Sequence, residues 1–183
     1  MLTERRYATV LERGWPGASW SLRGEDIENG LTWGGPGDRP SVAEITAIAE
    51  TLWLAEAKDT ARETIDRMAE REREAYITPG SGQAMVYLEK QAEARAFAED
   101  LDPQSGDYPL LEAMIDIDAH PVTGRPVSSL SEAAAVVTIL SVAWKSVAVE
   151  IEKRRLRAKR AIDAAASIDE VEAAMIDQGW MVP

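Results

Sequence analysis

The run over 130–165 constrains the fold of this chain more than any other part of the sequence. Eleven positions follow one another there at strictly alternating steps of three and four residues, and ten of them are apolar. This spacing predicts one narrow apolar seam along a helix of about five heptads. Neighbouring helices must cover it, from the same chain or from a partner. This heptad seam consists of Leu130, Ala133, Val137, Leu140, Trp144, Val147, Ile151, Arg154, Ala158, Ala161 and Ala165.

Other periodic segments predict further helices. A long one is expected over 42–75, because Ser41 and Glu44 form a capping box and no Gly or Pro follows until Pro79. Two more capping boxes, at 129–132 and 167–170, precede the seam helix and a final short helix. The remaining helices are expected over 2–13, 83–101, 110–118 and 168–178.

The N-terminal segments 18–22 and 30–33 alternate apolar and polar residues on either side of a polar turn. They predict a β-hairpin with Trp20 and Trp33 on one face. Two roles stay open for these tryptophans: anchors of an interface with another protein, or a small core under the hairpin.

The sequence therefore predicts a mainly α fold, with long helices in a bundle or coiled coil and a small β-hairpin module near the N-terminus. The expected domains are an adaptor module of a small helix plus hairpin (1–40), a long acidic helix (41–78) and a helical bundle or coiled-coil region (83–178).

Charge and composition argue against several classes of partner. The formal net charge is −12, which disfavours nucleic acid and anionic membrane surfaces, since both are bound through lysines and arginines. The most apolar stretch, 133–149, contains Lys145 and is expected to be too short and mixed to cross a bilayer.

Candidates for catalysis are few. One histidine and no cysteine leave little material for a catalytic triad. Asp116, Asp118 and His120 offer metal-ligating groups within five residues, but residues two apart on a helix do not face each other. The sequence predicts no enzyme, no cofactor and no metal site.

Six of the eight residues over 153–160 are basic. They could bind phosphate or an acidic partner, but pairing with the chain's own acidic helices is the preferred interpretation. Arg154 occupies a seam position, where it would set helix register if buried or extend its charged end outward.

Two arrangements of the helices remain open, a monomeric antiparallel bundle and a homotrimer of parallel helices. Val136, Ile139 and Ala143 widen the apolar face beyond the seam, which favours burial among more than two helices. The residues expected to form the helix-packing or oligomer contacts are Leu130, Val137, Leu140, Trp144, Val147, Ile151, Arg154 and Ala158.

Several segments carry a family resemblance. GASWSLRGED (17–26), GLTW (30–33) and RPSVAEI (39–45) resemble a short N-terminal module of tailed-bacteriophage proteins associated with tail fibres and baseplates. YLEKQAEA (87–94), YPLLEA (108–113) and RAKRAI (157–162) look like a helical segment common in phage tail proteins. The helix over 41–75 has no counterpart in this resemblance, so its role stays open.

The resemblance implies a structural protein of the phage tail that is made in the host cytoplasm and resides in the virion. It would connect or decorate the fibre or baseplate and contact other tail, fibre or baseplate proteins, with Trp20 and Trp33 as adaptor contacts. A homotrimer would match fibre symmetry. The alternative is a fibre-assembly chaperone that is absent from the mature virion.

Overall fold

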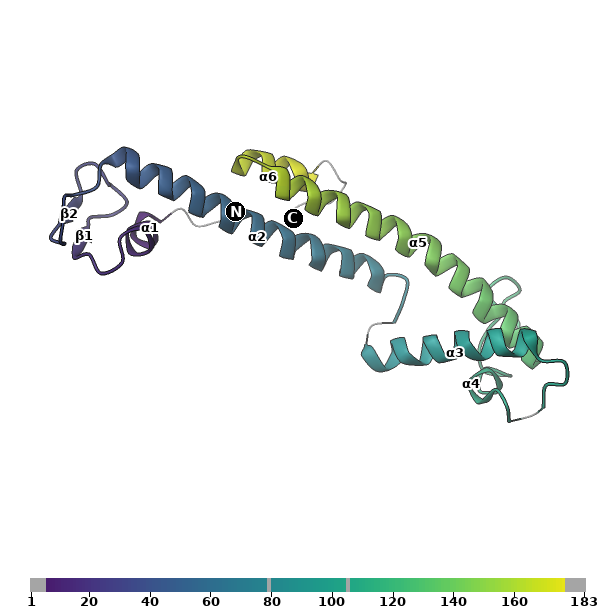
Figure 1. Cartoon of the computed structure of the whole chain (residues 1–183). Helices are drawn as coiled ribbons and strands as arrows, with labels where there is room; N and C mark the ends of the chain where they lie inside the picture. Colours follow the sequence, from purple (N-terminus) through teal and green to yellow (C-terminus); the bar gives the residue numbers. More distant parts are fainter. Residues whose placement is uncertain (1–5, 79, 105, 177–183) are drawn as a thin grey trace. The chain divides into compact units, whose positions relative to one another are not determined.

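The computed structural model describes residues 6–78, 80–104 and 106–176 (Figure 1). Its fold is mainly α with a small antiparallel hairpin near the N-terminus, as the sequence predicts. The elements in chain order are α1 (Tyr7–Gly14), β1 (Trp20–Leu22), β2 (Leu31–Trp33), α2 (Val42–Glu74), α3 (Ser81–Glu99), α4 (Pro109–Glu112), α5 (Leu130–Ala164) and α6 (Ile168–Ile176).

The chain forms two compact units. Unit 1 combines Met1–Met68 with Arg154–Pro183, and unit 2 is Ala69–Lys153. This grouping differs from the expected ranges 1–40, 41–78 and 83–178, because α2 and α5 are each divided between the two units.

The capping box predicted for α2 is present. The backbone amide of Ser41 donates to Glu44 Oε2 at 2.8 Å, and the amide of Glu44 donates to Ser41 Oγ at 3.2 Å. The serine hydroxyl also donates to the same carboxylate at 2.7 Å. These bonds satisfy amides that lack a partner at a helix start.

The caps of α5 and α6 share one bond with the capping box of α2 and differ in the other. The amides of Glu132 and Glu170 donate to Ser129 Oγ and Ser167 Oγ, each at 3.2 Å. The glutamate carboxylates reach one residue further back than in the standard box, to the amides of Ser128 and Ala166.

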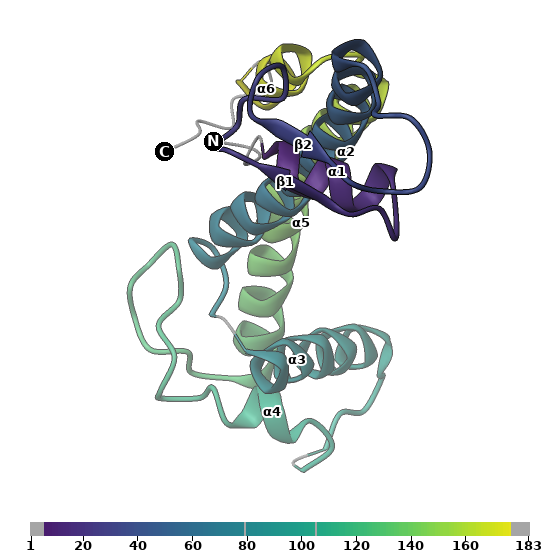
Figure 2. The same cartoon turned by 90° about the vertical axis from the view of Figure 1, so that its left-hand side faces the viewer.

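The hairpin of unit 1 has Trp20 and Trp33 on one face, as predicted. Strands β1 and β2 lie side by side and run antiparallel (Figure 2). In their register, Trp20 lies opposite Trp33 and Leu22 lies opposite Leu31. Both tryptophans are half-buried and pack against a core that α1, the hairpin and the first turns of α2 share. The buried members of that core are Val10, Leu11, Ile27, Leu31, Ile45, Ala49 and Trp53.

Unit 2 has its own core beneath the first turns of α5. Its buried members are Ala94, Tyr108, Leu111, Met114, Val127, Ala133, Ala134, Val136 and Val137. Glu93 of α3 holds the short helix α4 in place, since its carboxylate accepts from the amides of Leu110 and Leu111 at 3.0 and 2.9 Å. Within α3, whose residues are all described, Ala94 is the one buried residue.

The helix predicted over 110–118 is wrong beyond its first turn, since α4 ends at Glu112. Asp116 has a φ of 63°, a left-handed conformation that a helix cannot contain. Its amide donates to the carbonyl of Val127 at 2.7 Å, and Ala119 forms a β-bridge with Pro126. The segment folds back on itself because these long-range bonds replace the helical ones.

Candidate helix-packing surface

The heptad seam is only partly covered. In unit 2, Ala133, Val137 and Ile151 are buried, while Trp144 and Val147 are half-buried. Leu140 is 51% exposed. The chain itself therefore does not cover all the predicted packing residues of unit 2.

The seam residues of unit 1 are better covered. Ala158 and Ala165 are buried, and Arg154 and Ala161 are half-buried. Arg154 thus lies partly inside the packed region. The small alanines leave room for a close approach of neighbouring helices.

A second row of residues lies on the opposite face of α5 and is exposed along its whole length. At about 100° per residue, it is turned by roughly half a circle from the seam. We call this row the outer stripe. It consists of Ala135, Ile139, Val142, Ser146, Val149 and Lys153, all in unit 2.

The sequence contains the outer stripe, but the heptad seam on the other face is the stronger apolar pattern. The sequence assigns only Ile139 to an apolar face, as a widening of the seam. Yet Ile139 and Val149 are each 42% exposed and Val142 is 65% exposed. In the first turns of α5 the core of unit 2 covers Ala133, Val136 and Val137, so there the outer stripe lies on the uncovered side of the helix.

By length and composition alone, α5 is long and apolar enough to cross a membrane. Only 22% of its most apolar stretch is buried in the structure, unlike the core helix of a compact domain. The expectation that this stretch is too short and mixed to span a bilayer is therefore wrong as far as length and composition go.

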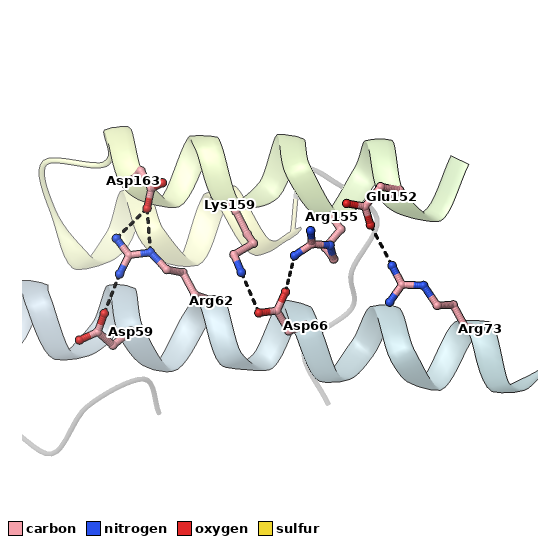
Figure 3. A network of polar contacts seen from close by, with 8 residues as sticks. All are labelled: Asp59, Arg62, Asp66, Arg73, Glu152, Arg155, Lys159 and Asp163. Carbon is pink, nitrogen blue, oxygen red and sulfur yellow. Dashed lines mark hydrogen bonds and ion pairs between the residues drawn. The ribbon is translucent and has the colours of Figure 1, made fainter. Parts of the chain in front are cut away.

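The basic run of α5 pairs with acidic residues of α2, as the preferred interpretation predicts (Figure 3). In unit 1, Asp66 accepts from Arg155 and from Lys159, both at 2.7 Å. One helical turn away, Arg62 of α2 contacts both Asp163 of α5 and Asp59 of its own helix, each at 2.6 Å. These contacts fix the two helices side by side within unit 1.

A separate ion pair lies within unit 2. Arg73 near the end of α2 donates to Glu152 of α5 at 2.8 Å and to Glu70 at 3.1 Å. The arginine side chain is 23% exposed, so it is more enclosed than either of its two partners, Glu152 and Glu70. The acidic helix α2 thus has a structural role, as the scaffold that binds the charged side of α5.

Two of the three candidate metal ligands have other partners. Asp118 pairs with Lys90 at 3.5 Å, and His120 Nδ1 accepts from the amides of Val122 and Thr123 at 3.2 and 3.4 Å. Among residues 6–78, 80–104 and 106–176, no group of three His, Asp or Glu side chains could hold a metal ion. Asp116, Asp118 and His120 are not brought together as a site.

The two predicted adaptor contacts, Trp20 and Trp33, also have intramolecular partners. Trp33 packs edge-on against Trp15, with ring centroids 6.3 Å apart, and its indole nitrogen donates to the carbonyl of Gly37 at 3.3 Å. Both tryptophans pack on the core of unit 1. In the structure both tryptophans therefore pack on that small core. Their contact with another protein remains a prediction.

Comparison with known proteins adds no relative. No family model matches the chain, and neither a curated protein nor a solved structure is significantly similar to it.

Proposed function

We propose that this chain is a non-enzymatic structural protein of a bacteriophage tail, which connects or decorates the fibre or baseplate through multimeric packing of its helices. The tail context comes from the sequence resemblance. The observation that carries the structural role is the uncovered apolar surface of unit 2.

That surface is concentrated in one part of the chain. Among the described residues, ten of the thirteen exposed large hydrophobic side chains belong to unit 2. Exposed apolar side chains that gather on one surface mark a contact with another protein, and four of these ten lie on α5 alone. The ten are Tyr76, Met85, Leu88, Leu101, Ile117, Val122, Ile139, Leu140, Val142 and Val149.

The division of the chain suits such a role. Unit 1 has its own core around the hairpin and carries the ion pairs that link α2 to α5. It would present the hairpin module to a neighbouring tail protein, while unit 2 supplies the helices for multimeric packing. The protein would be made in the host cytoplasm and then be incorporated into the virion tail.

Quantitative mass spectrometry of purified virions tests this proposal. A structural component is expected at a constant ratio to the major tail proteins, in every preparation and after repeated density-gradient purification. A chaperone would be abundant in the infected-cell lysate and lost from the virions. That second result would refute the structural role and support the assembly role.

A further inference from the structure

We propose that the outer stripe of α5 packs in parallel and in register against the outer stripe of further copies of this chain. The inference deepens the proposed function, on which it rests, by naming the chain itself as the partner of its exposed helix face.

The spacing of the stripe is that of a coiled coil. From Ala135 to Lys153 the residues follow one another at steps of four, three, four, three and four. A row with this average spacing of 3.5 residues stays on one face only when helices wind around each other. The core positions called a are then Ile139, Ser146 and Lys153, and those called d are Ala135, Val142 and Val149.

The flanking charges favour a parallel arrangement of identical helices. Lys145 precedes an a position and Glu150 follows a d position, so they occupy the g and e positions. In a parallel coiled coil, a g residue lies beside the e residue five positions later on the next helix, and such pairs set orientation. Lys145 of one copy would therefore meet Glu150 of the next. An antiparallel arrangement brings like positions together instead.

The intrahelical bond of Glu150 does not oppose this pairing. Lys153 donates to Glu150 at 2.7 Å, but both side chains are more than half exposed. Exposed pairs of this kind contribute little to stability. A carboxylate can accept several hydrogen bonds, so an exposed intrahelical partner does not prevent a contact with a lysine of another copy.

The core residues favour three copies. Ile139, Val142 and Val149 are β-branched at both a and d positions, a composition that shifts parallel coiled coils from dimers toward trimers. Lys153 would occupy an a position near one end of the stripe, where its long stem can extend to solvent.

A lipid bilayer fits the same face less well. Lys145 lies near the middle of the apolar stretch, where a charge opposes insertion. The other side of the helix packs on the unit 2 core through Ala133, Val136 and Val137. In its first turns α5 is therefore covered on one side by protein, which suits a helix-to-helix contact better than a helix surrounded by lipid.

Self-association of the full chain tests the proposal. Light scattering on the size-separated wild type is expected to give the mass of three chains. Val142→Glu is expected to weaken association by about tenfold or more, because it places a charge in an apolar contact. Leu101→Glu is the matched control, since Leu101 is fully exposed and lies outside the stripe. Both variants should keep the circular dichroism of the wild type.

Orientation is tested by cross-linking, for which a chain without cysteine is well suited. In the Val142→Cys variant, the cysteines of two copies are expected to form a disulfide under mild oxidation, because parallel in-register helices bring the same position of each copy together. Thr32→Cys, exposed on the hairpin, should remain largely uncoupled. Coupling of Val142→Cys only when it is mixed with Ser146→Cys would indicate antiparallel helices and overturn the inference.

Other results would also overturn it: a monomeric wild type, an unchanged mass for Val142→Glu, or co-sedimentation of the monomer with phosphatidylcholine–phosphatidylglycerol vesicles. These outcomes are separable from the fate of the proposed function. A monomeric chain that is a constant virion component refutes only this inference. A trimeric chain that is absent from virions refutes only the tail role.

Discussion

Asp66 of α2 accepts a hydrogen bond from Lys159 of α5 at 2.7 Å, and its second oxygen accepts one from Arg155 at the same distance. One carboxylate therefore binds two cations that lie a helical turn apart. The arrangement fixes the register of α2 against α5 within unit 1 more firmly than a single exposed pair would.

Asp66→Asn should destabilise the protein by about 1 kcal/mol or less, since the Asp66 side chain is 46% exposed and solvent screens the pair. For a chain of this size we expect a fall in Tm of roughly 2–4 °C. Asp59→Asn is the control, because Asp59 is 75% exposed and its ion pair with Arg62 lies within α2. Thermal unfolding followed by circular dichroism at low and high salt measures both. Equal effects of the two variants would contradict the bridging role.

Acid should weaken the same contact. Burial raises the pKa of Asp66, but the hydrogen bonds from Lys159 and Arg155 outweigh that effect and lower the pKa below its usual value. A group with a lowered pKa stabilises the folded state above its unfolded-state pKa of about 3.9, and this contribution is lost as the pH falls further. Below about pH 4, the Tm difference between wild type and Asp66→Asn should shrink. A constant difference would rule out this linkage.

Leu111→Ala should be among the most damaging changes in unit 2. Leu111 is fully buried in the unit 2 core, and truncating a buried leucine leaves a cavity, with a loss of about 2–5 kcal/mol. The control is Leu101→Ala, at a fully exposed leucine. Urea unfolding of both variants gives the comparison, and similar midpoints would show that the core is not packed as described.

The capping box of α2 can be tested at Ser41. Ser41→Ala removes the acceptor of the Glu44 amide and a donor to the Glu44 carboxylate, so we expect a loss of about 1 kcal/mol. Ser131→Ala, at an exposed position inside the first turn of α5, is the matched control and should change stability little. A Ser41→Ala protein as stable as the control would show that the box does not contribute.

Alkaline pH should act on unit 2 through Tyr108. Its hydroxyl donates to Asp100 at 2.7 Å, and this bond, with burial as a further cause, raises the pKa of Tyr108 to about 12. The unfolded chain loses this proton near pH 10, so stability should fall as the pH rises from 10 to about 12. Tyr108→Phe should remove the highest step of the phenolate absorbance titration. Persistence of that step would assign it to another tyrosine.

Local signals in the sequence predict much of this fold. Alternation and capping depend on residues close together in the chain. They predict the hairpin with Trp20 and Trp33 on one face and the start of α2 at the Ser41–Glu44 box. The pairing of Arg155 with an acidic helix follows from charge balance. Its actual partner, Asp66, depends on how distant segments meet, and no local pattern gives that.

The errors have the same origin. The segment over 110–118 has a helical pattern. It does not form the helix, because the amide of Asp116 donates to the carbonyl of Val127, eleven residues further along the chain. For the candidate surface, the sequence predicts an apolar helix face along α5. It does not predict which side is free, because that depends on the covering of Val136 and Val137 by the unit 2 core.

The sparse burial of α3 has a consequence for hydrogen exchange. A helix of 19 residues that buries only Ala94 gains little from packing, and packing supplies most of the stability of helices in proteins. Its amide protons should therefore exchange with deuterium through local opening, well before those around Ile45 and Ala49 in the core of unit 1. If a partner chain covers α3 in an assembly, the slowing of that exchange would reveal the contact.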